Sequence, residues 1–200
     1  MKTRMISAML VCLCWITLRL EGQAQNPAPS FKEEPQFSVG YLYQGSQPAL
    51  GNGRFGMNGG RADVLFPLRR HFGLVGEFSG AHTNSVPGAG TGLTLVTYMA
   101  GPRFSMPLRR GGEAHPIVPF AQLLLGGVHG SEGLFPHGST MSNSANSFAM
   151  SAGGGLQVGM SRRLSLRLVQ AEYLYTRLPN LFDNYQNSYR IGAGLVLRLR

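Results

Sequence analysis

The sequence predicts an all-β protein folded as an eight-stranded antiparallel up-and-down transmembrane β-barrel. Three observations favour this fold. Long segments alternate large apolar residues with small or polar ones, as strands do when one side faces lipid and the other faces a lumen. Short basic gaps between these segments alternate with longer polar gaps, which is typical of a meander. Charged residues make up only 14% of the 200 residues, whereas about 25% is typical of soluble domains.

The chain begins with a segment that has the features of a secretory signal peptide, residues 1–24. Two basic residues precede an apolar run at 5–18, and the small residues Gly22 and Ala24 stand just before the expected cleavage point. An N-terminal membrane anchor is the alternative, but the run is shorter than the about 20 residues that a helical span requires.

A polar linker that contains prolines is expected at residues 25–36, before a barrel domain at 37–200. Both cysteines of the chain, Cys12 and Cys14, lie in the expected leader. The mature barrel would then contain no disulfide, and its stability would come from strand pairing and packing alone.

The barrel domain divides into eight strand-like segments. Their approximate bounds are 37–44, 54–66, 71–83, 91–106, 117–130, 147–160, 164–177 and 188–200. Several segments reach about 12 residues, which exceeds the common length of soluble strands and suffices for a tilted membrane strand of about 9 to 11 residues. We expect the eighth segment to pair with the first, because closure removes the sheet edges that lipid cannot satisfy.

In the first four segments, apolar residues recur at every second position over part of each segment, and these residues predict the lipid-facing side. They are Phe37, Val39, Tyr41, Tyr43, Ala62, Val64, Phe66, Phe72, Leu74, Phe78, Tyr98, Ala100, Pro102 and Phe104. The residues between them should face the lumen, including Arg61 and Val75. Many inward positions are glycine, and we expect these glycines to make room for larger side chains across a narrow lumen.

The last four segments differ in how clearly they alternate. The fifth is apolar on both sides near residues 120–125, so the pattern does not assign its inward side. The sixth and eighth alternate cleanly. In the seventh, the apolar phase shifts by one residue near Leu168, which predicts a β-bulge. The outward residues expected in the sixth and eighth are Phe148, Met150, Ala152, Leu156, Val158, Met160, Tyr189, Ile191, Ala193, Leu195, Leu197 and Leu199.

The gaps between segments form two classes that should lie at opposite ends of the barrel. The first class carries three arginine pairs: Arg69, Arg70, Arg109, Arg110, Arg162 and Arg163. The second class is Gly-, Ser-, Asn- or Pro-rich and occupies residues 45–53, 84–90, 131–146 and 178–187. Because small barrels have short periplasmic turns and longer external loops, the arginine pairs are expected on the periplasmic side. Anionic lipid head groups would be their counter-charge.

Several charged residues face the lumen in this register. The candidates for ion pairs there are Asp63, Glu77, Arg103, Glu172 and Arg190, with Arg167 as a further member. An eight-stranded interior is just wide enough for side chains to fill, and an unpaired charge inside it would be costly. We therefore expect an ion-pair plug that includes both Glu172 and Arg103, and we expect the lumen to be occluded by Leu42, Gln157, Arg103 and Arg190. A gated ion pathway is the alternative.

The histidines and serines of the third external gap are the other candidates for chemistry. His129, His137 and Ser139 could supply a Ser-His pair, but no third orienting group is evident. A metal site at the two histidines lacks a second ligand pair with the expected spacing. We therefore predict no catalytic, metal or cofactor site.

The leader, the eight alternating segments and the Gly-rich inward sides resemble the small eight-stranded outer-membrane β-barrels of the OmpA-transmembrane and opacity-protein type. The phrases GPRFS at 101–105, GGGLQ at 153–157 and QAEY at 170–173 add to the resemblance. It implies a monomer in the outer membrane of a Gram-negative-type envelope, with outer-membrane lipids and the barrel-assembly machinery as partners. The chain ends on Leu199-Arg200, where the family usually ends on an aromatic residue.

The function expected from these features is a structural or surface-interaction role without catalysis. An extracellular ligand would be bound by the external gaps, chiefly 131–146 and 178–187. The alternatives are a narrow pore for small solutes, an outer-membrane lipid-modifying enzyme, and a soluble exported barrel that binds a lipophile. A net charge of +9 could suggest nucleic-acid binding, but the arginine pairs lie in turns, without a basic helix or an aromatic-interleaved patch.

Overall fold

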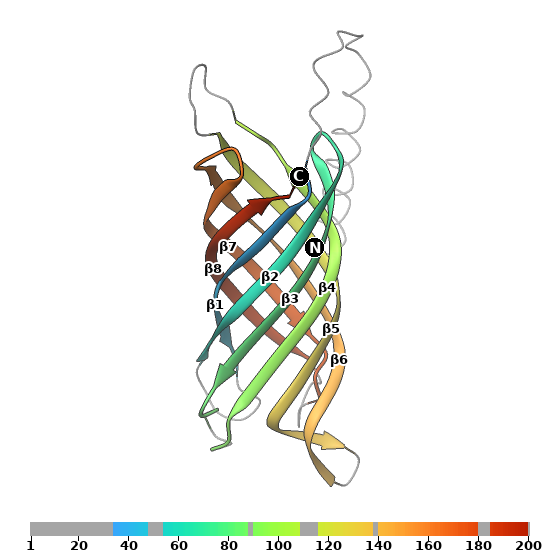
Figure 1. The fold of residues 1–200 in the computed structure, drawn as a ribbon. Helices are drawn as coiled ribbons and strands as arrows, with labels where there is room; N and C mark the ends of the chain where they lie inside the picture. The colour runs from blue at the N-terminus through green and yellow to red at the C-terminus, as the bar shows by residue number, and fades with distance from the viewer. Residues whose placement is uncertain are drawn as a thin grey trace, which may run out of the picture. The chain divides into compact units, whose positions relative to one another are not determined.

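The computed structural model describes residues 34–47, 54–87, 90–108, 116–137, 140–179 and 185–199. The expected signal peptide and most of the linker lie outside these residues. The described part forms one closed barrel of eight antiparallel strands in sequence order (Figure 1). The strands are β1 (Gln36–Ser46), β2 (Phe55–Arg69), β3 (Phe72–Thr83), β4 (Leu93–Ser105), β5 (Ile117–His137), β6 (Thr140–Gly159), β7 (Leu164–Thr176) and β8 (Gln186–Arg198).

The barrel closes through β1, which pairs with both β2 and β8. Phe37 stands opposite Val64 of β2 and opposite Leu197 of β8. The predicted fold class, strand number and closure are therefore confirmed. Among the described residues, no helix is long and apolar enough to cross a membrane.

The polarity of the barrel is inverted relative to a soluble protein. Outward aromatic side chains are exposed, with Phe78 59% exposed and Tyr41 54%, while Arg103 inside the barrel is 1% exposed. In β5, which the pattern left unassigned, Phe120 and Leu124 face the lumen. The neighbouring Leu123 and Leu125 face outward and are exposed. Both sides of this strand are apolar because its inward side chains pack in the lumen, while its outward side chains form part of the apolar exterior.

The phase shift in β7 is a β-bulge, as predicted. Gln157 of β6 pairs with Arg167, and the preceding Leu156 pairs with Val169, so Leu168 has no partner in this ladder. Leu168 and Val169 are both exposed. The extra residue shifts the alternation by one position, so that Arg167 before the bulge and Gln170, Glu172 and Leu174 after it all face the lumen.

Inward glycines are required for a reason other than the expected one. A β-carbon added to Gly40 would collide with the backbone of Ala193 and Gly194 on β8, and one added to Gly194 would collide with the backbone of Val39 and Gly40. Gly40 and Gly194 face each other in the ladder. The glycines therefore allow neighbouring strands to approach in a tightly curved wall, rather than only leaving room across the lumen.

The largest departure from the sequence prediction is in the expected loop at 131–146. Most of it is strand: β5 continues to His137 and β6 begins at Thr140. Figure 1 shows these two strands extending well past the other strands at this end of the barrel. Their pairing skips between Ser131 and Phe135, where Glu132 adopts a left-handed backbone with φ 64°. Ser, Asn and Gly have low β-propensity, so only cross-strand pairing makes this segment a hairpin.

Candidate functional site

The middle of the lumen contains a layer of seven charged side chains, each at most 6% exposed. We call it the charged layer; its members are Arg61, Asp63, Glu77, Arg103, Arg167, Glu172 and Arg190. It includes all five predicted lumen residues and Arg167. Arg61 was not among the predicted ion-pair candidates, although it has the same inward parity as Asp63 two residues later. That parity is the signal that could have identified it.

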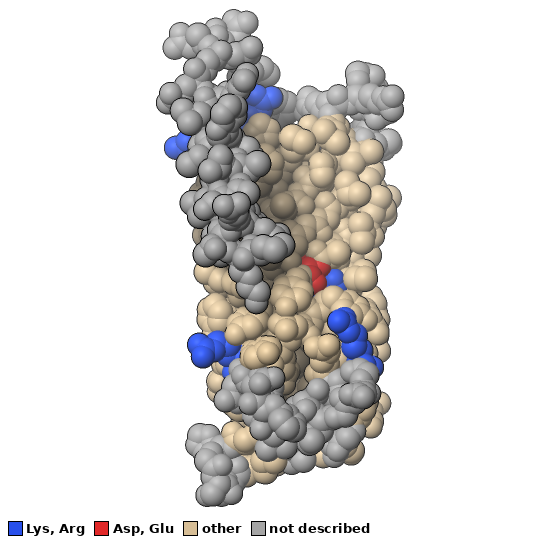
Figure 2. Space-filling view, turned by 180° about the vertical axis from the view of Figure 1, so that it is seen from behind, with Lys and Arg blue, Asp and Glu red and all other residues tan. Residues whose placement is uncertain are grey.

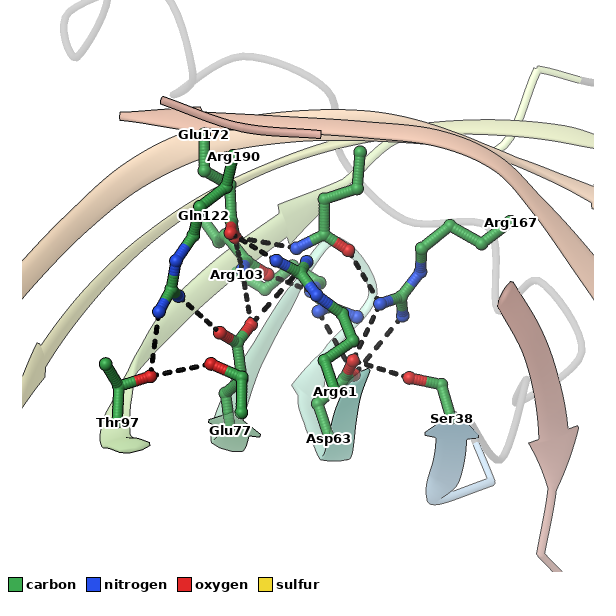
Figure 3. Close-up of polar contacts among 12 residues, drawn as sticks. Ser38, Arg61, Asp63, Glu77, Thr97, Arg103, Gln122, Arg167, Glu172 and Arg190 are labelled. Carbon is green, nitrogen blue, oxygen red and sulfur yellow. Dashed lines mark hydrogen bonds and ion pairs between the residues drawn. The ribbon is translucent and has the colours of Figure 1, made fainter. Parts of the chain in front are cut away.

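Asp63 is shared by two arginines. Its carboxylate accepts hydrogen bonds from Nη1 of Arg167 at 2.6 Å and from Nη2 of Arg103 at 3.2 Å. The hydroxyl of Ser38, on the neighbouring strand, donates to the same carboxylate. One acidic group on β2 therefore joins β1, β4 and β7 (Figure 3).

Glu172 is held by one arginine and two amides. Its Oε2 accepts from Nη2 of Arg61 at 2.6 Å, and its Oε1 accepts from the amides of Gln122 and Gln170, both at 2.7 Å. Glu172 and Arg103, which we expected in one cluster, do share it, but no direct bond between them is present. Gln122 links them, because its Oε1 accepts from Nε of Arg103 at 2.8 Å.

Glu77 of β3 and Arg190 of β8 form the third part of the charged layer. Nη1 of Arg190 lies 3.4 Å from Oε1 of Glu77, and Nη1 of Arg61 lies 3.8 Å from its Oε2. Arg190 also donates to Gln44 at 3.1 Å and to the hydroxyl of Thr97 at 3.0 Å. The contacts of Arg190 with Glu77 and Thr97 cross the lumen between strands that are not neighbours in the sheet (Figure 3).

An aromatic ring borders the charged layer toward the arginine-pair end. The guanidinium carbons of Arg103 and Arg167 lie 4.6 Å and 5.2 Å from the ring centroid of Phe120. Both distances are within the range of cation–π attraction. The two guanidinium groups that contact this ring also share Asp63. Attraction to the ring and to the carboxylate partly offsets the repulsion between the two positive charges.

Toward the loop end, the lumen is filled by apolar side chains. We call this cluster the apolar plug; it contains Phe55, Met57, Leu93, Leu95, Val128, Phe135, Leu174 and Leu178, all at most 9% exposed. Leu42 and Gln157, which were expected to occlude the lumen, are also buried. The sequence analysis did not predict the plug: Phe135 and Leu178 were assigned to external gaps, and the inward sides of the segments that contain the other members were unassigned or expected to be small or polar.

The histidine and serine candidates do not form a catalytic arrangement in the described residues. Nδ1 of His129 lies 2.8 Å from the side-chain oxygen of Asn146, which is a cross-strand contact in the β5–β6 hairpin. Ser139 and the side chain of His137 lie outside the described residues. Within the described ranges, no group of three or more His, Cys, Asp or Glu side chains is placed to hold a metal ion.

The arginine pairs that the structure describes lie at one end of the barrel. Arg69, Arg70, Arg162 and Arg163 are all exposed there, and Arg109 and Arg110 lie outside the described residues. In the view of Figure 2, Lys and Arg atoms are visible near the top and again below mid-height, a small acidic and basic spot lies between them, and most of the described surface is uncharged. Such a distribution matches an apolar environment around the middle of the barrel.

Comparison with known proteins supports the fold. No protein-family model matches the chain, and no curated protein matches it in sequence. Among solved structures, Neisserial surface protein A matches with a TM-score of 0.55 and 14% identity, over 82% of this chain and 97% of that one. The attachment invasion locus protein Ail of Yersinia pestis matches with a TM-score of 0.48 and 18% identity, over 83% of this chain and 99% of that one. The chain has the eight-stranded barrel fold of Neisserial surface protein A.

Proposed function

We propose that this protein is an integral outer-membrane β-barrel with a structural and surface-interaction role, without catalysis and without a continuous pore. The observation that carries this proposal is the inverted polarity of the barrel. Seven charged side chains are buried in the lumen, while large apolar side chains of all eight strands are exposed. In water, so large an apolar surface would promote association, whereas a bilayer satisfies it.

The proposed orientation of the barrel in the membrane rests on the difference between its two ends. The exposed arginines of the turns at 69–70 and 162–163 lie at the end with short turns, and we place this end in the periplasm. The β5–β6 hairpin lies at the opposite end and would project from the cell. Anionic head groups would attract the arginine end by about 1 kcal/mol per arginine near the surface.

The projecting hairpin is the part best suited to contact a partner. β6 pairs with β7 from Ala149 onward, and the carbonyl of Phe148 accepts from the backbone N–H of Arg177, so residues 140–147 pair with β5 alone within the described chain. This outer edge contains no charge and no proline between Thr140 and Asn146. Natural edge strands are usually protected by such residues, and an unprotected edge can accept an added strand.

The alternatives are less well supported by the same observations. A soluble barrel that binds a lipophile would need a polar exterior and an open apolar cavity, but here the exterior is apolar and the lumen is filled. A pore would need a continuous path past the charged layer and the apolar plug. A lipid-modifying enzyme would need a nucleophile whose proton is directed at a base. The hydroxyl of Thr94 lies 2.8 Å from Nδ1 of His82, but it donates its proton to Glu132 at 2.7 Å.

Fractionation and gel mobility test the membrane proposal. The protein should be recovered with outer membranes after density separation, and unheated samples should migrate faster in detergent gels than boiled ones, because a barrel formed in lipid resists detergent. Recovery in the soluble periplasmic fraction, with identical mobility before and after boiling, would overturn it. Absence of turnover on membrane-lipid substrates by both the native chain and the Ser139→Ala variant would rule out the lipid-modifying enzyme.

A further inference from the structure

The β5–β6 hairpin extends beyond both of the strands that flank it. On one side, the last pair of the ladder between β4 and β5 is Thr94 with Ser131, and β5 continues past it. On the other side, the ladder between β6 and β7 reaches Ala149, and one further bond joins the N–H of Arg177 to the carbonyl of Phe148. Within the described chain, the hairpin therefore has two outer edges.

Only one of these edges is protected against pairing. The β5 edge contains Glu132, which is charged and has a left-handed backbone with φ 64°, and Pro136, which has no N–H. The β6 edge, residues 140–147, contains neither a charge nor a proline. Natural edge strands that stay single usually carry such interruptions. The contrast within one hairpin indicates that the β6 edge is available for pairing.

A proline of β7 ends the ladder on the side of the β6 edge. The N–H of Arg177 donates to the carbonyl of Phe148 at 3.0 Å. Two residues farther along each antiparallel strand, Pro179 would stand opposite Asn146. Because proline has no N–H, β7 cannot add the next pair of hydrogen bonds. The β6 edge therefore begins at a residue that stops the chain from pairing with itself.

The carbonyl of Phe148 also shows which backbone groups of the β6 edge point away from β5. The N–H and C=O of one strand residue point to the same side, and this side alternates along an antiparallel strand. Since Phe148 points toward β7, the backbone groups of Ser142, Ser144 and Asn146 point to the same side. The hydroxyl of Ser142 donates to the carbonyl of Ser144 at 2.9 Å and accepts from the N–H of Ser144 at 3.3 Å. A partner strand can replace this local side-chain contact.

We infer that the β6 edge pairs with the same edge of a second copy of this protein, whose barrel lies in a facing membrane. An antiparallel pair centred on Ser144 places this residue opposite Ser144 of the second copy, and Ser142 opposite Asn146. The outward-pointing backbone groups of both edges then meet. The hairpin extends past the other strands at its end of the barrel and would meet a facing surface first (Figure 1). The inference rests on the proposed outward orientation of the hairpin.

The side chains of the β6 edge favour an identical partner. Residues 142–147 are only Ser, Asn and Ala. Two such edges carry no like charges that would repel each other, and their small side chains leave the backbones free to approach. They also form no pockets that would select the side chains of a foreign strand. Recognition therefore depends on the match between two uncharged backbone edges.

Symmetry places the second copy in a facing membrane. The two-fold axis of an antiparallel strand pair is perpendicular to the sheet, and around a barrel this direction lies in the plane of the membrane. Copies within one membrane share their orientation and are related by rotation about the membrane normal. Only copies in facing membranes satisfy the antiparallel pairing, so the protein is a monomer in its own membrane.

A single contact of this kind is weak. The β6 edge is a short strand, and its pairing buries much less than the about 1,600 Å² of a standard protein interface. Many copies on two facing surfaces act together, however, and such multivalency raises the overall avidity by roughly 10²- to 10⁴-fold. The measurable result is therefore adhesion between cells, and not a stable dimer in solution.

The test is the settling of Gram-negative cells that display the protein and have a truncated surface polysaccharide. Cells with the native chain should aggregate and settle, whereas cells without it should stay suspended. Ser144→Lys and Ser144→Glu each place like charges opposite each other and should abolish settling. A mixture of these two populations should restore it, because Lys then faces Glu. Ser85→Lys adds the same charge at an exposed turn between β3 and β4 and should settle like the native chain.

Three results would overturn the inference. Native cells could stay suspended although Asn143→Cys in the hairpin is labelled at their surface; the proposed function would then stand without the pairing. Settling could persist in Ser144→Lys, or fail to return in the mixture although both variants keep the native heat-modifiable mobility. Finally, slow hydrogen exchange at the Ser144 amide in dilute, detergent-solubilised monomer would show that the protein's own chain already covers the edge.

Discussion

Arg61 on β2 and Glu172 on β7 form an ion pair across the lumen, with 2.6 Å between Nη2 and Oε2. The two residues lie 111 positions apart in the chain, on strands that do not pair in the sheet. Their bond therefore ties opposite walls of the barrel, which the backbone ladders cannot do. The other ion pairs of the charged layer depend on Asp63 and Glu77.

Removal of Glu172 should be strongly destabilising. Glu172→Ala removes the acceptor of Arg61 and Gln170 and the nearer of the two acceptors of Gln122, and breaking one side of a buried pair typically costs about 3 to 5 kcal/mol. Replacing both partners with apolar residues, Arg61→Met with Glu172→Leu, should cost much less. Urea unfolding in detergent measures the free energy of unfolding of both variants. If Glu172→Ala is as stable as the native chain, the Arg61–Glu172 ion pair does not stabilise the barrel.

The glycines between β1 and β8 should not tolerate side chains. Gly40→Ala places a β-carbon against the β8 backbone and should destabilise the barrel by about 1 to 3 kcal/mol, as overpacking does. Gly76→Ala is the matched control, because Gly76 has nothing within 4 Å of an added β-carbon. Equal unfolding midpoints for the two variants would show that the close approach of β1 and β8 can relax.

The extra residue of the bulge should be dispensable, whereas the inward phase of Arg167 and Gln170 should not be. Deletion of Leu168 leaves Arg167, Val169 and Gln170 opposite the same β6 partners and on the same sides of the sheet, so this variant should fold with the native heat-modifiable mobility. Deletion of both Leu168 and Val169 makes Arg167 and Gln170 adjacent, so that one of them faces the lipid. An arginine on the lipid side costs about 2 to 4 kcal/mol at mid-depth, and its lumen contacts are lost as well. Equal unfolding midpoints for the single and the double deletion would contradict this prediction.

Surface labelling should reveal the orientation. Asn143→Cys in the exposed part of the β5–β6 hairpin should react with a membrane-impermeant maleimide on intact cells, because we place this end outside. Arg162→Cys at the opposite end should react only after the cells are opened. The inverse labelling pattern would reverse the proposed topology.

The barrel should not conduct as a porin does. The apolar plug and the charged layer fill the lumen, so planar bilayers containing the protein should lack sustained large steps. Phe55→Ala with Phe135→Ala, which opens the plug, should increase any residual leak. Stable conductance of the native chain with passage of small solutes would instead favour the pore.

The sequence by itself determined the number of strands, their inward and outward sides in most segments, and the bulge. These features depend on the two-residue period of a strand, which is local: the alternation of Phe148 and its neighbours, or the phase shift at Leu168, is visible within a few residues. The inward position of the charged residues followed from the same period.

The tertiary structure alone decided which of these residues meet. The pairing of Glu172 with Arg61, while Arg103 binds Asp63 and Gln122, depends on strand stagger and on contacts across the lumen between distant parts of the chain. The apolar plug also depends on the closed sheet, because β5 is apolar on both sides and only the closed barrel determines which side faces the lumen. The strand character of residues 131–146 depends on pairing between β5 and β6, because polar residues of weak β-propensity do not form strands by themselves.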